Sequence, residues 1–96
     1  MAILVLSSKA REELTLLSMH IESERKGYGL KFLHAFQRSE EVLRKFPEAA
    51  PIKDNGYRQY KIERFSVLVI YSFQQNTITV VQFIHTARNP GRRQVM

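Results

Sequence analysis

The last twelve residues of the chain gather the side chains best suited to bind an anion. Arg88, Arg92 and Arg93 lie close together, no acidic residue occurs among residues 85–96, and His85 begins the segment. Arginine carries a permanent charge and several donors, and histidine titrates near neutral pH. The segment 85–96 is therefore predicted to be a basic C-terminal tail that contacts an anionic or carboxylate-rich target.

Lys61 is a further candidate for the same positive surface. Period-two alternation in the run 57–63 places Tyr60 and Ile62 on one face, toward the helices, and Lys61 and Glu63 on the other. The predicted target-binding residues are then His85, Arg88, Arg92, Arg93 and Lys61.

Some of these side chains also have purely structural interpretations. A histidine at a strand end commonly hydrogen-bonds a neighbouring carbonyl, and this is the main alternative for His85. Arg58 opens a strand, so we interpret it as a structural cation that ties down the preceding turn by bidentate bonding. His20 and His34 have no carboxylate or third histidine nearby to complete a ligand set, so no metal site is predicted.

Composition restricts the class of protein. A chain of 96 residues, with 44% hydrophobic and 25% charged residues, suits one globular domain spanning 1–96. The absence of cysteine excludes disulfides, zinc–thiolate sites and a thiol nucleophile. The apolar run 2–6 is too short for a signal peptide or a membrane span, so a cytoplasmic location is expected. The net charge of +6 indicates either an anionic partner or a well-solvated surface.

Hydrophobic periodicity predicts the elements that position these groups. Residues 2–6 are expected to form a strand buried on both faces, and Ser7 or Ser8 to cap a helix over about 9–24. Glu12 and Glu13 suit the dipole at the start of that helix. The glycines at 27 and 29 lead into a second helix, from about 30 until Pro47 stops it. The two helices form an αα-hairpin whose apolar face covers the later strands.

Three strands are predicted after a loop at 47–56, over 57–63, 66–73 and 77–84, with a turn at 74–76. The apolar stripe of the second helix, which we interpret as core, consists of Phe32, Leu33, Phe36, Leu43 and Phe46. The expected fold is α+β in the order β-α-α-β-β-β, a strand and an αα-hairpin followed by a three-stranded antiparallel meander. His85 then stands at the exit of the sheet, and the strand end is a rigid support for the basic tail.

This order of elements occurs together with four short motifs, which are Gly56-Tyr57-Arg58, Tyr60-Lys61-Ile62, Val69-Ile70-Tyr71 and Ile84-His85-Thr86-Ala87-Arg88-Asn89-Pro90. Over nearly the whole chain the combination resembles the ParE branch of the RelE/ParE superfamily of toxin–antitoxin toxins. The resemblance implies the toxin of a type II toxin–antitoxin system, which inhibits DNA gyrase by direct binding, blocks replication and is not an enzyme.

The same resemblance implies the partners. A ParD-like antitoxin neutralises the toxin in a hetero-oligomer, and Arg58, Tyr60 and Tyr71 are structural residues or antitoxin contacts. Neither a cofactor nor direct sequence-specific binding of nucleic acid is expected.

The RelE branch of the superfamily implies a different activity, the metal-independent cleavage of mRNA on the ribosome. That chemistry needs a base for the 2′-hydroxyl, cations for the phosphorane and an acid for the leaving oxygen, and Lys61, His85 and Arg88 would supply them here. The second RelE lysine falls on Glu63, which repels a phosphate, and the RelE tyrosine falls near Gln94. An inactive homologue that still binds an antitoxin is the third interpretation.

Overall fold

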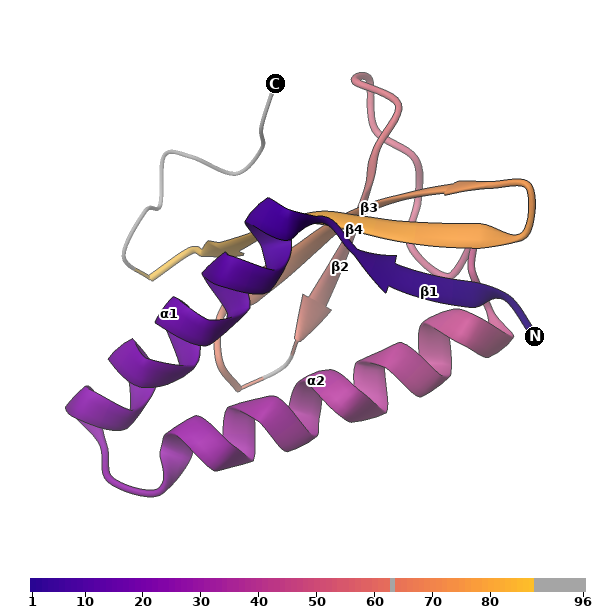
Figure 1. Ribbon diagram of the computed structural model, residues 1–96. Helices are drawn as coiled ribbons and strands as arrows, with labels where there is room; N and C mark the ends of the chain where they lie inside the picture. Colours follow the sequence, from indigo (N-terminus) through magenta and orange to yellow (C-terminus); the bar gives the residue numbers. More distant parts are fainter. Residues whose placement is uncertain (63, 88–96) are drawn as a thin grey trace.

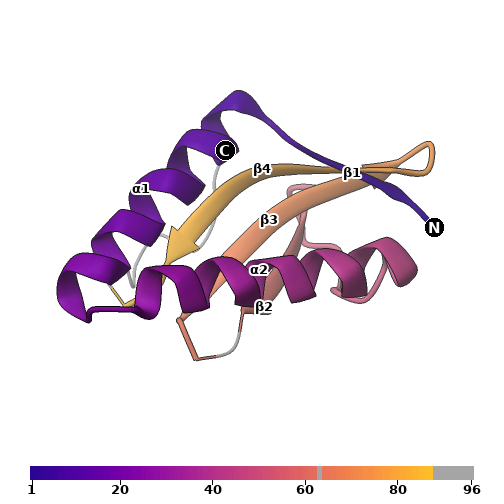
Figure 2. The same ribbon diagram turned by 60° about the horizontal axis from the view of Figure 1, so that its bottom comes forward.

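The arrangement of elements matches the expected order. The computed structural model describes residues 1–62 and 64–87. Its elements are β1 (Ile3–Leu6), α1 (Ser8–Glu24), α2 (Tyr28–Lys45), β2 (Arg58–Ile62), β3 (Val67–Gln74) and β4 (Thr77–His85). The strands form one sheet in the order β1-β4-β3-β2, and both helices lie on one side of it (Figure 1, Figure 2). The predicted α+β fold is confirmed.

β1 is an edge strand, and the prediction that it is buried on both faces is wrong. It pairs in parallel with β4, from Ile3 opposite Thr77 to Leu6 opposite Val80. Ile3 is 59% exposed and Val5 44% exposed, whereas Leu4 and Leu6 pack against the core. A short apolar run fits either environment, and only the tertiary pairing decides between them.

Ser7 provides the predicted cap of α1, because its Oγ accepts a hydrogen bond from the Ala10 amide at 3.0 Å. The helix begins at Ser8, so Glu12 and Glu13 lie beyond its first turn and their expected role at the dipole is wrong. Glu13 Oε1 instead accepts a hydrogen bond from the Phe83 amide at 2.9 Å. The pairing of β1 with β4 ends at Val80, so β1 does not reach the Phe83 amide further along β4. The Glu13 carboxylate accepts the hydrogen bond from that amide instead.

The connection between the helices is short and closely packed. Gly27 precedes α2 with a φ of 87°, a conformation that glycine adopts without strain. A Cβ on Gly29 would lie 2.8 Å from the Ser18 carbonyl oxygen, so only glycine permits this approach of the two helices. Both views show the helices meeting here and diverging along the sheet (Figure 1, Figure 2). α1 then packs on β4, and α2 reaches both edge strands, β1 and β2.

Glu22 of α1 caps the start of α2. Its Oε2 accepts the Gly27 amide and its Oε1 accepts the Gly29 amide, both at 2.9 Å. These two backbone hydrogen bonds, the one from Gly27 foremost, lower the pKa of the Glu22 carboxyl below its usual 4.5.

We expect the cap to stabilise the fold in a pH-dependent way. A carboxyl whose pKa is depressed on folding contributes stability above its unfolded pKa and loses it as the pH falls through the folded value. Glu22→Gln should therefore lower Tm at neutral pH, and the difference from the natural protein should shrink below about pH 4.5. Thermal melts followed by circular dichroism from pH 7 to pH 3 measure this. Glu12→Gln makes the same chemical change at an exposed position of α1 and should leave Tm near the natural value. If Glu22→Gln lowers Tm by the same amount at every pH, the prediction is wrong.

The core lies between the helices and the sheet. Phe32 and Leu43 of α2 and Tyr71 of β3 are fully buried, and the Phe36 ring meets the Phe83 ring at a centroid distance of 5.1 Å. Phe46, predicted as core, is 64% exposed, because α2 ends one residue before it. No helix in the described part of the chain has both the length and the apolar character of a membrane span.

The β3–β4 hairpin determines which residue of β3 lies opposite His85, the last residue of β4. Gln75 and Asn76 both have positive φ, as in a type I′ turn, and lie within the predicted turn at 74–76. Ile70 pairs with Gln82 and Tyr71 with Val80, so β4 contains one extra residue at this bulge. Beyond it the pairing continues until Val67 lies opposite His85.

Candidate functional site

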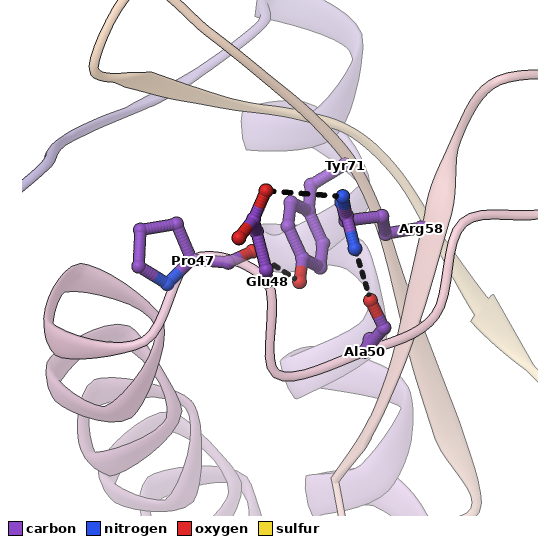
Figure 3. A network of polar contacts seen from close by, with 5 residues as sticks. All are labelled: Pro47, Glu48, Ala50, Arg58 and Tyr71. Atoms are coloured by element: carbon purple, nitrogen blue, oxygen red, sulfur yellow. Dashed lines mark hydrogen bonds and ion pairs between the residues drawn. The ribbon is translucent and has the colours of Figure 1, made fainter.

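Arg58 and Tyr71 lie opposite each other on β2 and β3 and hold the loop that follows α2 (Figure 3). Arg58 Nη1 donates to the Ala50 carbonyl oxygen at 2.6 Å, and Nη2 lies 3.7 Å from a Glu48 carboxylate oxygen. The Tyr71 hydroxyl donates to the Pro47 carbonyl oxygen at 2.9 Å. Both side chains therefore fasten the loop to the sheet.

Burial raises the pKa of the Tyr71 hydroxyl, so the group stays a neutral donor at physiological pH. Tyr60 lies opposite Val69 on the same pair of strands and is partly buried against the core. The structure thus brings together Arg58 and Tyr71 of the predicted contact set and places Tyr60 at the helix-facing side of β2.

Lys61 and His85 do not share a site. Lys61 is exposed and lies opposite Leu68, whereas His85 lies opposite Val67. Val67 is a fully buried core residue, and successive residues of a strand point to opposite faces. His85 consequently faces the helices and Lys61 lies on the other face of the sheet. This geometry does not support a joint catalytic role for the two residues.

His85 lies beside α1. Its ring and the His20 ring meet edge to face with a centroid distance of 5.9 Å, and His20 Nε2 lies 3.3 Å from a Glu24 carboxylate oxygen. Among residues 1–62 and 64–87, no three histidine, aspartate or glutamate side chains form a group that could hold a metal ion.

The exit of β4 is anchored to the turn before β3. The Thr86 amide and hydroxyl both donate to the Ser66 carbonyl oxygen, at 2.8 and 2.9 Å. Arg88, Arg92 and Arg93, together with Glu63, lie outside the described residues, so their predicted roles stay predictions. Thr86, near the end of the described residues, is therefore held to the turn before β3.

A group of basic side chains that our sequence interpretation did not bring together lies beside α2. Lys31, His34 and Arg38 line one side of a cleft. The predicted site residue Lys61 lines it from β2, and Arg64 lines it from the β2–β3 turn. The spacing i, i+3, i+7 puts the first three on one face of a helix, and this signal was available in the sequence.

Comparisons with known proteins identify the family. The family model described as the ParE toxin of the type II toxin–antitoxin system parDE matches residues 4–90. A solved structure titled as the chromosomal ParDE TA system from P. aeruginosa contains a chain that superposes with a TM-score of 0.75 at 18% sequence identity, over 88% of this chain and 96% of that chain. A comparison with curated proteins found no match. Since the family model covers most of the sequence and the fold agrees, this chain belongs to the ParE toxin family of type II toxin–antitoxin systems.

Proposed function

We propose that this protein inhibits DNA gyrase by direct binding, so that replication stops, and that a ParD-like antitoxin neutralises it in the cytoplasm. The observation that carries the proposal is the match to the ParE toxin family over residues 4–90. Inhibition by binding requires a complementary surface but no catalytic group of the toxin's own.

The position of the candidate catalytic residues favours binding over cleavage. General acid–base catalysis on one phosphodiester needs its groups within hydrogen-bond reach of the same few atoms. Lys61 and His85 lie two strands apart and on opposite faces of the sheet. The RelE-type ribonuclease is therefore the less favoured function.

Exposed apolar side chains support the antitoxin as a partner. Within the described residues, Leu16 and Met19 of α1, Leu30 of α2, and Ile3 and Val5 of β1 are all exposed. An amphipathic helix or an extended segment could bury such side chains, and the net charge of +6 would speed association with an acidic partner. Most of the binding energy would come from the apolar contacts.

Parallel assays on the two possible targets test the proposal. Purified protein is added to a gyrase supercoiling and DNA-cleavage assay and to translating ribosomes with a labelled message. We expect supercoiling to be lost while the message stays intact, and the ParD-like product of the adjacent reading frame to restore supercoiling. Message cleavage without loss of supercoiling would replace the proposal with ribonuclease activity, and a folded protein inactive in both assays would be an inactive homologue.

His85→Ala serves as the control for catalysis. If binding alone accounts for toxicity, removing the imidazole should weaken gyrase inhibition only by the loss of one contact of the predicted target-binding set, because no proton transfer depends on His85. A variant that folds, binds antitoxin and has lost message cleavage would instead place His85 in a nuclease mechanism.

A further inference from the structure

A cleft runs between α2, the edge strand β2 and the β2–β3 turn. It has a volume of about 570 Å³, within the range of roughly 300–1,000 Å³ that is usual for ligand sites. It belongs neither to the Arg58–Tyr71 network nor to the exit of β4. Two residues with a predicted contact role, Tyr60 and Lys61, also line it.

Both sides of the cleft carry positive charge. Lys31 and Arg38 are exposed on α2, Arg64 is exposed on the turn, and Arg25 lies at the end near the helix connection. Within residues 1–62 and 64–87 no carboxylate lines the cleft, and none of these four cations forms an ion pair. Cations gathered without compensating acids create a positive potential that attracts a polyanion.

Aromatic and apolar side chains lie among these cations. The Tyr28 ring has the Arg25 guanidinium 4.3 Å and the Lys31 ammonium 4.4 Å from its centroid. Tyr60 lines the cleft from β2, and Val42, 38% exposed, lines it from α2. The cation–π contacts hold Arg25 and Lys31 at the wall of the cleft and cover the Tyr28 ring, so the aromatic and apolar surface beside the charges is that of Tyr60 and Val42.

We propose that this cleft binds single-stranded nucleic acid without sequence specificity, with phosphates against the cations and bases against the Tyr60 ring. A basic groove with interleaved aromatic side chains is the arrangement by which single strands are held, because each nucleotide brings a charge and a π-face. The inference goes beyond the proposed function, since it assigns a ligand other than gyrase or the antitoxin.

The dimensions favour an oligomer over a single phosphate. Lys31 and Arg38 are separated by seven residues, or about 10 Å along a helix axis, and Arg25 extends the row. One phosphate cannot contact both ends of such a row, whereas consecutive phosphates of a strand can. An acidic peptide would also be attracted to the charges, but its carboxylates have no favourable interaction with the Tyr60 ring that lines the cleft.

Arg64 offers a way to separate stability from binding. Its φ of 77° lies in the left-handed region, which is unfavourable for a residue with a Cβ and favourable for glycine. Arg64→Gly should therefore keep or raise Tm while it weakens binding. If Arg64 contributed only to folding, Arg64→Gly would not weaken binding while Tm is kept or raised.

The test measures fluorescence anisotropy of a labelled oligothymidylate of roughly a dozen nucleotides, a length suited to one small groove. The variant combines Lys31→Gln, Arg38→Gln and Arg64→Gln. The control combines Lys9→Gln, Arg11→Gln and Lys53→Gln, which removes the same charge from exposed residues outside the cleft. Circular dichroism melts confirm that each chain is folded.

We expect the slope of log K against log salt to become shallower by about 2 in the cleft variant, since each phosphate contact to a single strand contributes about 0.7. Affinity at moderate salt should fall about tenfold or more in that variant, and by far less in the control. Arg64→Gly alone should weaken binding without lowering Tm.

Three results would overturn the inference. The first is equal weakening by the cleft variant and the control, which would mean that only net charge matters. The second is equal or tighter binding of a duplex of the same length. The third is complete displacement of the oligonucleotide by polyglutamate at lower concentration than by unlabelled oligothymidylate, which would assign the cleft to an acidic peptide. None of these measurements involves gyrase, so this inference and the proposed function can fail independently.

Discussion

A chain that ends at Ala87 should fold, bind its antitoxin and no longer stop growth. The deletion removes Arg88, Arg92 and Arg93 and no acidic residue, and so half of the net charge of +6. The described core is formed by residues from Ala2 to Phe83, and β4 ends at His85. We expect gyrase inhibition to weaken at least about 100-fold, which corresponds to roughly 3 kcal/mol of binding free energy. Growth after induction and titration of the supercoiling assay measure the effect.

A full-length variant separates charge from chain length. Arg88→Gln, Arg92→Gln and Arg93→Gln together keep every backbone atom while removing the three guanidinium groups, so the variant should lose most of the same inhibition. Its Tm should stay close to that of the natural protein. A truncated chain that melts cooperatively, binds antitoxin and remains fully toxic would refute the predicted role of the tail.

The sequence predicts the helix ends and the hairpin turn of this fold well, because each depends on residues only a few positions apart. Ser7 caps α1 through a hydrogen bond three residues away, and Pro47 follows Phe46, the residue that caps the end of α2. The turn residues Gln75 and Asn76 take the positive φ that a two-residue hairpin requires. Each depends on local backbone chemistry, which does not change with the tertiary context.

Contacts between distant parts of the chain were not predictable in this way. β1 pairs with β4, more than 70 residues later in sequence, and that pairing makes it an edge strand with Ile3 and Val5 exposed. Glu13 reaches the Phe83 amide for the same reason, because α1 follows β1 along the edge of β4. Hydrophobic pattern alone carries no information about which strands become neighbours.

The candidate site was predictable in its residue types but not in its geometry. Lys61 and His85 were grouped because both could act on a phosphate, yet the register of β2, β3 and β4 places them on opposite faces. The cations of α2 give a weaker sequence signal than the apolar stripe of Phe32, Phe36 and Leu43 on the same helix. A helix has more than one face, and charged residues on its polar face are equally typical of a solvated surface.

Arg58→Met and Tyr71→Phe should each loosen the loop between α2 and β2. The guanidinium hydrogen bond to Ala50 joins a charged donor to a backbone carbonyl, so its loss should cost about 1.5–3 kcal/mol of unfolding free energy. Tyr71→Phe leaves the Pro47 carbonyl without its donor and should cost about 1–3 kcal/mol. Urea denaturation of each variant measures the change through the midpoint at constant m-value.

The double variant shows whether the two side chains act together. They face each other across β2 and β3 and bond to carbonyls three residues apart, so the second substitution should cost less once the first has released the loop. Glu48→Gln is the matched control: Glu48 has a 73% exposed side chain and lies 3.7 Å from Arg58, and exposed ion pairs contribute about 0–1 kcal/mol. The two hydrogen bonds to the loop backbone do not hold the loop together if the losses of unfolding free energy add fully in the double variant. The same conclusion follows if Glu48→Gln costs as much unfolding free energy as Arg58→Met.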